Sequence, residues 1–216
     1  HSPLVLFFHG GGLLVAASPA VDGFCRDCAR SGKVCVQVNY SLSPVSSALL
    51  ALPVFCAILF AACGFAFPSV IAAAVSLAMV PLVFWRRAVH PLQLDECEEA
   101  SSWAVNHAAD FGADGEKLVV FGESSGGQLA MLLAMTRPQA PGIRGVIALS
   151  PPVDYREEAL QKMHPASRWV VKCLLLRRQF GTDPLALRHV SPMEHLARGR
   201  LGRTPLLLVC ASNEFA

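Results

Sequence analysis

Mainly apolar runs recur along this 216-residue chain, and longer stretches of mixed polarity separate them. Five of the short runs predict buried strands, at 4–8, 34–38, 118–121, 145–149 and 206–210. Three longer stretches predict helices, at 19–31, 94–111 and 127–135. Strands that alternate with helices in this way indicate an α/β fold, in which helices flank a mostly parallel sheet of right-handed βαβ units.

The predicted helix at 94–111 shows which of its faces is buried. Its small and apolar residues recur at helical spacing, at Leu94, Cys97, Ala100, Ala104 and Ala108. Its acidic residues crowd the first turns, where the helix dipole favours negative charge, and we expect them to be solvated. Residues 112–116 predict a turn. Residues 156–200 are less regular and more basic, and 156–178 predicts a pair of helices over the site.

The segment 45–85 contains no charged side chain. A glycine and a proline divide it into two apolar stretches, each slightly shorter than the roughly 20 residues of a membrane-spanning helix. Both of its ends rejoin one globular domain, so we expect an inserted apolar helical hairpin over 45–89. Three interpretations stay open for it: a hairpin in contact with a membrane, a helical lid over the site, or intron sequence translated in error.

Between a predicted strand and a predicted helix lies the pattern G-x-S-x-G, formed by residues 122–126 with Ser124 at its centre. A strand that turns sharply into a helix forces the central residue into a strained backbone conformation and exposes its side chain. The flanking glycines avoid collisions with the neighbouring strand and helix. Ser124 is therefore the candidate nucleophile. An ordinary glycine turn is the alternative for this motif taken alone.

A second glycine motif, His9-Gly10-Gly11-Gly12, directly follows the first predicted strand. Backbone N–H groups without neighbouring side chains can approach a substrate oxygen closely. Gly10, Gly11 and Gly12 together with the N–H of Ser125 therefore form a candidate oxyanion hole. We expect the side chain of His9 to brace this loop rather than to move protons.

Composition narrows the remaining choices. With 53% hydrophobic residues, the chain can bury one sizeable core, so we expect a single domain over 1–216. The net charge of +2 and the lack of any long basic cluster argue against a nucleic-acid partner.

Cys25-x-x-Cys28 has no second such pair, which favours two thiols on an amphipathic helix over a zinc or redox site. No metal and no organic cofactor is implied.

These motifs resemble those of the hormone-sensitive lipase family of α/β-hydrolases. The matching stretches are 9–12, 39–44, 90–91, 95–97, 103–105 and 122–127. The resemblance covers most of the chain except 45–89, and implies the α/β-hydrolase fold. That family more often has Asp before its nucleophile and Ala after it, so Glu123 and Ser125 are mild departures. The family also carries earlier strands and an N-terminal cap segment, so we expect a fold that is incomplete at both ends.

The fold that the resemblance implies has its catalytic residues in the order Ser, acid, His. Glu214 follows the last predicted strand and is the candidate acid, where the family more often has Asp. An ordinary loop carboxylate is the alternative. The three histidines between Ser124 and Glu214 would break the expected order. We therefore expect the general-base histidine to lie beyond Ala216.

The resemblance implies a carboxylic ester hydrolase that works through a serine nucleophile and an acyl-enzyme intermediate. Its substrate would be a small-molecule or lipid ester, and the apolar segment 45–85 weakly favours a lipid. Two alternatives stay open: a catalytically inactive hydrolase-fold protein that binds a ligand, as plant gibberellin receptors do, and an inactive fragment. A membrane-associated and a cytoplasmic location are both compatible with the sequence.

Overall fold

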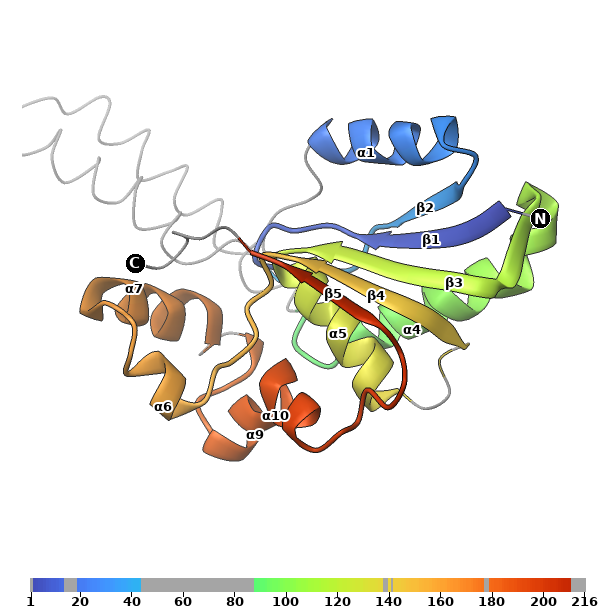
Figure 1. Ribbon diagram of the computed structural model, residues 1–216. Helices are drawn as coiled ribbons and strands as arrows, with labels where there is room; N and C mark the ends of the chain where they lie inside the picture. Colours follow the sequence, from blue (N-terminus) through green and yellow to red (C-terminus); the bar gives the residue numbers. More distant parts are fainter. Residues whose placement is uncertain are drawn as a thin grey trace, which may run out of the picture.

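A parallel sheet brings the carboxyl ends of its strands to one edge. The computed structural model describes residues 2–13, 19–43, 88–137, 140, 142–176 and 179–210. Within these residues the strand order is β2-β1-β3-β4-β5, and every neighbouring pair is parallel (Figure 1). The strands are β1 (Ser2–Phe8), β2 (Val34–Val38), β3 (Ala113–Glu123), β4 (Ile143–Leu149) and β5 (Leu206–Val209). All five predicted strands are confirmed.

The predicted turn at 112–116 is wrong in part, because β3 begins at Ala113. The start of β1 pairs with this stretch: Ser2 lies opposite Ala113 and Pro3 opposite Asp114. The next pair is Leu4 with Leu118, so the register shifts and residues 115–117 have no partner in β1. The sequence of a strand that contains an irregularity of this kind resembles the sequence of a polar turn.

The main helices also follow the sequence pattern, with one difference. α1 is Pro19–Arg30, α4 is Leu92–Asn106 and α5 is Ser125–Thr136. The stretch predicted as one helix to residue 111 ends at Asn106, and a 3₁₀ helix, η1 (Ala108–Phe111), follows it. His107 leaves the helical conformation, with φ −105° and ψ 8°, and this breaks the hydrogen-bond ladder between the two elements.

Short helices occupy residues 157–197. They are α6 (Glu157–Leu160), α7 (Pro165–Val170), the π-helix η2 (Val171–Leu176), α9 (Pro184–His189) and α10 (Pro192–Ala197). Within the stretch 156–178, one helix at 157–160 and a second at 165–170 that continues into a π-helix agree with the predicted helix pair. Three of them begin at a proline, whose fixed φ and missing N–H suit the first helical turn. In Figure 1, α6 and α7 lie on the side toward which the strand arrows point.

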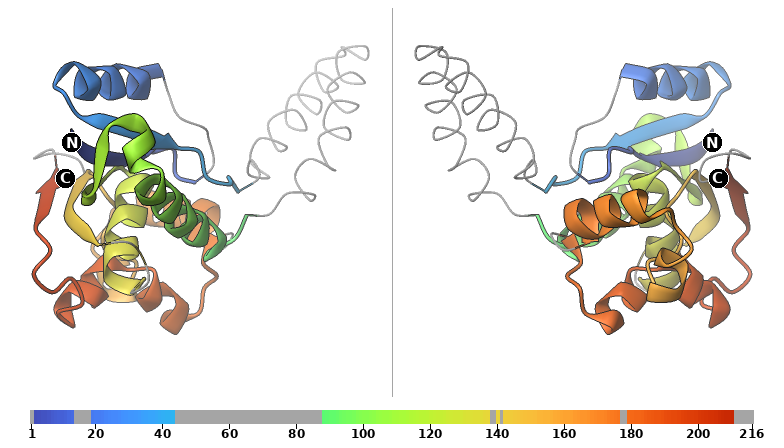
Figure 2. Two further views of the ribbon diagram at one scale, coloured as in Figure 1. Left: turned by 90° about the vertical axis from the view of Figure 1, so that its right-hand side faces the viewer. Right: turned by 90° about the vertical axis from the view of Figure 1, so that its left-hand side faces the viewer.

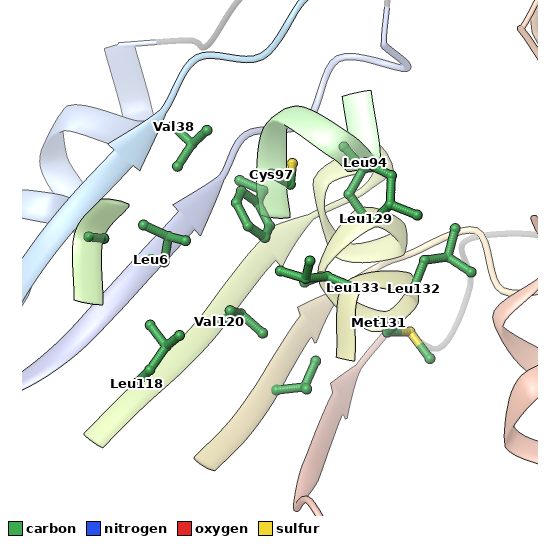
Figure 3. Close-up of a cluster of buried hydrophobic side chains, with 14 of the residues drawn as sticks. Leu6, Val38, Leu94, Cys97, Leu118, Val120, Leu129, Met131, Leu132 and Leu133 are labelled. Carbon is green, nitrogen blue, oxygen red and sulfur yellow. The ribbon is translucent and has the colours of Figure 1, made fainter. Parts of the chain in front are cut away.

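Helices cover both faces of the sheet (Figures 1 and 2). On one face Phe24 and Cys25 of α1 pack against Val5, Phe7 and Phe121. On the other face α4 and α5 pack against the strands; Figure 3 shows side chains of both helices beside those of β1 and β3. The expected core face is confirmed: Leu94, Cys97 and Ala104 of α4 and Ala108 of η1 are buried, and Ala100 is partly buried against the same core. The fold is therefore a three-layer α/β arrangement.

A second, smaller core joins the short helices. It contains Tyr155, Leu160, Leu176, Leu187 and Val190. The ring of Phe180 packs against both this core and the main core. The short helices are therefore attached to the sheet through the stretch that includes residues 179 and 180.

The apolar segment 45–85 lies outside the described residues, which omit 44–87. The inserted hairpin over 45–89 and its contact with a membrane thus stay predictions. In the part of the chain that the structure describes, no helix has both the length and the apolar character needed to cross a membrane.

Candidate active site

Ser124 lies at a sharp turn between β3 and α5. β3 ends at Glu123 and α5 begins at Ser125, and Ser124 between them has φ 50° and ψ −121°. Residues other than glycine rarely adopt this backbone conformation, so the turn is strained. Two backbone hydrogen bonds hold it: Ser124 N donates to Leu149 O at 2.8 Å, and Gln128 N donates to Ser124 O at 3.1 Å. The strand–turn–helix context predicted for the motif is confirmed.

The flanking glycines are needed because backbone passes directly over them. A Cβ at Gly122 would overlap the backbone of Gly126 and Gly127 across the turn. A Cβ at Gly126 would overlap the carbonyl oxygens of Phe8 and His9, at the end of β1. The turn is therefore pressed against the end of the neighbouring strand, and this contact brings Ser124 to the loop that follows β1.

The structure brings the two glycine motifs together. A Cβ built on Gly10 would lie 3.3 Å from the Cβ of Ser124 and 3.2 Å from the carbonyl oxygen of Glu123. Gly11 and Gly12 have φ 117° and 62°, and Leu13 has φ 61°. The loop thus depends on conformations that favour glycine at its centre. The candidate nucleophile and the candidate oxyanion loop are neighbours, although 112 residues separate Gly12 from Ser124.

The first half of the loop is held by two aromatic rings. The Tyr40 hydroxyl donates to His9 O at 2.6 Å, and His9 Nδ1 donates to Gly10 O at 2.6 Å. The two rings are stacked, with centroids 4.3 Å apart and planes 8° from parallel. Burial raises the pKa of the Tyr40 hydroxyl, although contact with Ser125 opposes the shift, so the hydroxyl stays a donor. The bracing role expected for His9 is confirmed.

The second half of the loop is held by two polar side chains. Leu13 N donates to Ser125 Oγ at 3.3 Å, and Gln179 Nε2 donates to Gly12 O at 2.9 Å. Ser125 and Gln179 are both buried, with exposed fractions of 4% and 1%. The carbonyl and the N–H of one peptide group, between Gly12 and Leu13, are thus both bound to side chains.

This arrangement has the chemistry of an anion site beside a hydroxyl. Ser125 is the first residue of α5, where backbone N–H groups have no partner within the helix and the helix dipole is positive. Gly11 and Gly12 add N–H groups from the loop beside Ser124. Fixed donors of this kind stabilise the negative charge that develops when a hydroxyl attacks a carbonyl.

The other members of the predicted triad are not seen with Ser124. Glu214 lies outside the described residues. Among the residues that the structure describes, no histidine is hydrogen-bonded to the Ser124 hydroxyl. His195 is buried and its ring contacts His189 O at 2.8 Å and Arg200 Nη1 at 3.2 Å. These contacts occupy both ring nitrogens of His195.

The cysteines of the C-x-x-C pair lie on α1, as expected. Cys25 contacts a third thiol, that of Cys35 on β2, with the sulfur atoms 3.3 Å apart. All three thiols are free, and burial raises the pKa of Cys28 and Cys35. Within the described residues no group of histidine, cysteine and acidic side chains has the arrangement of a metal site.

Three contact residues of the loop were not identified as such from the sequence. The sequence places Tyr40 in a matched motif without a role, indicates only the N–H of Ser125, and carries no signal for Gln179. Tyr40 and Ser125 had a signal, since both belong to stretches that match the lipase family. Gln179 had none, because it reaches Gly12 across 167 residues of chain.

Comparisons with known proteins agree with this geometry. Hormone-sensitive lipase of Ictidomys tridecemlineatus is 27% identical over 152 residues, which cover 68% of this chain and 14% of that protein. Phenmedipham hydrolase of Pseudarthrobacter oxydans is 26% identical over 205 residues, which cover 93% of this chain and 32% of that protein. This chain therefore spans less than a third of the length of either relative.

Solved structures share the fold. Carboxyl esterase 2 of Tuber melanosporum superposes with a TM-score of 0.62 at 18% identity, covering 98% of this chain and 59% of that chain. Esterase 2 of Thermogutta terrifontis, phosphonylated by sarin, gives a TM-score of 0.60 at 19% identity, covering 97% and 72%. The family model described as the alpha/beta hydrolase fold matches residues 72–214. The chain belongs to the alpha/beta hydrolase fold family, and the resemblance to hormone-sensitive lipases is confirmed.

Proposed function

We propose that the protein containing this chain hydrolyses carboxylic esters through Ser124. The observation that carries the proposal is the position of Ser124 at a strained turn, with its Cβ 3.3 Å from the Cβ position of Gly10 in the glycine loop. A hydroxyl that projects from such a turn beside unhindered N–H groups is the arrangement that acyl transfer requires.

In the proposed reaction the Ser124 hydroxyl attacks the ester carbonyl and forms a tetrahedral intermediate. The N–H groups of Gly11, Gly12 and Ser125 stabilise its oxyanion. The general base takes the proton of the Ser124 hydroxyl during the attack and gives it to the leaving alcohol. The base then takes a proton from water, which hydrolyses the acyl-enzyme, and returns it to Ser124. We assign this base to a histidine beyond Ala216, oriented by the carboxylate of Glu214. No metal or cofactor takes part in these steps.

The names of the similar proteins support an ester as the substrate. They include hormone-sensitive lipase, Lipase 2 of a Moraxella species and Esterase LipI of Mycobacterium tuberculosis. The solved esterase of Thermogutta terrifontis is described as phosphonylated by sarin, so that protein reacts with an organophosphorus reagent. A lipid-derived ester fits the lipases and the apolar segment 45–85, while a small-molecule ester fits the esterases.

The second candidate function is the binding of a ligand without turnover, by a hydrolase-fold protein without the general base. A hydroxyl without a base is a poor nucleophile. A hydrolase-fold pocket of this kind would bind an ester or acid and release it unchanged.

A fluorophosphonate probe distinguishes the two functions, with the protein expressed from its complete coding sequence. We expect the wild type to be labelled and Ser124→Ala to lose all labelling, because the probe bonds covalently to an activated serine. Ser167→Ala, which changes an exposed serine on α7, is the matched control and should label as the wild type does. Labelling that persists in Ser124→Ala would rule out this nucleophile. A wild type that stays unlabelled but binds carboxylic acids or esters would support the second function.

A further inference from the structure

The oxyanion loop is a chain of peptide groups, and each group can be examined for what fixes its orientation. The group between His9 and Gly10 is held through its carbonyl, which accepts from the Tyr40 hydroxyl. The next group, between Gly10 and Gly11, is held through its carbonyl by the His9 ring. That second group carries the N–H of Gly11. The first candidate donor is therefore oriented by the adjacent His9 ring and, through the preceding peptide group, by Tyr40.

The N–H of Gly12 belongs to the following peptide group, between Gly11 and Gly12. Glycines on both sides leave this group free to rotate, because glycine tolerates both signs of φ. Its orientation is fixed only if the next group, between Gly12 and Leu13, is also held. Gln179 Nε2 holds the carbonyl of that next group, and Ser125 Oγ accepts from its N–H.

Gln179 differs from the other contact residues of the loop in its own neighbours. Its backbone carbonyl accepts from His90 N at 3.2 Å, and the next residue, Phe180, packs against both hydrophobic cores. The Phe180 ring lies 5.5 Å from that of His90 and 5.6 Å from that of Tyr155. Gln179 is thus connected to the short helices on one side and to the glycine loop on the other.

We infer that Gln179 is a positioning residue for the oxyanion hole, one that fixes the Gly12 N–H through the Gly12–Leu13 peptide and ties it to the short helices. The inference rests on the proposed ester hydrolysis. It adds that the position of the short helices controls how well the Gly12 N–H is oriented toward the oxyanion. A shift of Gln179 would break its hydrogen bond to the Gly12 carbonyl and release that peptide group.

The energetic reason lies in burial. Gln179 is 1% exposed, so its side-chain amide has little access to water that could replace its hydrogen bond to the half-buried Gly12. A side chain without a donor leaves the carbonyl unpaired and lets the peptide group rotate. Loss of one oxyanion donor lowers turnover by about 100-fold to 1,000-fold in a serine hydrolase, and partial misalignment costs less.

The test compares Gln179→Met, which keeps the side-chain length without a donor, with Gln179→Asn, which keeps the amide one methylene shorter. Gln161→Met alters an exposed glutamine among the same short helices and is the matched control. Hydrolysis of a p-nitrophenyl ester gives kcat and KM for the protein expressed from its complete coding sequence. Hydrogen exchange of the peptide that covers residues 9–13 reports the loop directly, without any need for turnover.

We expect Gln179→Met to lower kcat about 10-fold with KM changed less than about 2-fold, because the oxyanion forms only after binding. Exchange in residues 9–13 should quicken, while exchange in β3 stays unchanged. Gln179→Asn should fall between Gln179→Met and the wild type, and Gln161→Met should match the wild type.

An active wild type with either Gln179 variant folded and equal to it in kcat would overturn the inference and leave the proposed function standing. If Gln179→Met fails to fold, the milder Gln179→Asn decides the matter by the same comparison. A kcat loss without faster exchange in residues 9–13 would also overturn the inference, since the loop would then not have moved. A wild type that neither hydrolyses esters nor labels at Ser124 would overturn the proposed function, and the role of Gln179 with it.

Discussion

The turn around Ser124 and the loop of Gly10–Gly12 lie side by side, yet different forces hold them. The turn is fixed by backbone packed against backbone: a Cβ at Gly122 or Gly126 would overlap main-chain atoms. The loop is fixed by side chains that come from other parts of the chain and bind its peptide groups. The turn therefore depends on close main-chain contacts, including those with the end of β1, whereas the loop depends on side-chain hydrogen bonds from other parts of the chain.

This difference has a consequence for tolerance to change. In a turn this closely packed, any added side-chain atom overlaps main-chain atoms, and few alternative backbone conformations are available to relieve the overlap. A loop held by hydrogen bonds loses one bond at a time, at about 0.5–1.5 kcal/mol each, or 1–3 kcal/mol where a buried partner is left unpaired. We expect changes at the turn to affect folding and changes at the loop to affect mainly function.

The largest effect is expected from Gly126→Ala. The added methyl group would overlap the carbonyl oxygens of Phe8 and His9, and neither can move without displacing β1. The free energy of unfolding should fall by about 4 kcal/mol or more, as for the most damaging core substitutions. Urea denaturation followed by circular dichroism measures the change.

Gly23→Ala is the matched control for that substitution. A Cβ at Gly23 meets no atom within 4 Å, and the residue lies inside α1. The free energy of unfolding should rise by about 0.5–1 kcal/mol, because alanine favours the helix. Equal stability of the two variants would show that steric exclusion does not fix the turn.

A second effect should appear as the pH falls. Burial lowers the pKa of His90 to about 4, and the charge of Arg137 acts in the same direction. In the unfolded chain the pKa of histidine is about 6.5, so between these values the unfolded state binds more protons. Stability contributed by the neutral ring is complete above about pH 6.5 and is lost as the pH falls toward 4. After an allowance for partial exposure of the ring, the loss is about 2 kcal/mol.

His90→Gln should remove this pH dependence, which urea titrations at several pH values between 4 and 7 would measure. His90 N donates to the backbone carbonyl of Gln179, whose side chain holds the glycine loop. As the pH falls, the glycine loop should therefore loosen at a higher pH than the turn around Ser124. Between pH 7 and pH 5, the protection from hydrogen exchange, measured relative to the intrinsic rate at each pH, should then fall in residues 9–13 and not in residues 119–123. A variant with the same pH slope as the wild type would contradict the role assigned to His90.

The smallest effect is expected from Tyr40→Phe. This change removes the donor to His9 O and keeps the ring that stacks on His9. Leaving a buried carbonyl unpaired should lower the free energy of unfolding by about 1–2 kcal/mol. Fluorophosphonate labelling of Ser124 should slow several-fold, because the loop loses an anchor.

Tyr155→Phe is the control for Tyr40→Phe, since the Tyr155 hydroxyl donates to Gln128 Oε1 at 3.2 Å and makes no contact with the loop. It should cost similar stability and leave the labelling rate unchanged. If both variants slow labelling equally, the loop is not the element through which Tyr40 acts.

The sequence predicted most of the architecture because the relevant signals are local. Apolar runs of strand length located β1 to β5, and glycine spacing located the turn at Ser124 and the loop after β1. Its errors lay where a tertiary contact overrode local pattern. The stretch from Ala113 looked like a turn and pairs with the start of β1, and the helix toward residue 111 ends early at His107.

What the sequence alone determined is a serine at a forced backbone turn and a glycine-rich loop after a strand, since both follow from which residues lack a Cβ. What only the tertiary structure decided is the orientation of that loop. Of the four side chains that fix it, Tyr40, Ser125 and Gln179 lie 31, 112 and 167 residues from the residues they bind. A hydrogen bond across such a separation leaves no periodicity in the chain, because only the folded sheet brings its donor and acceptor within reach.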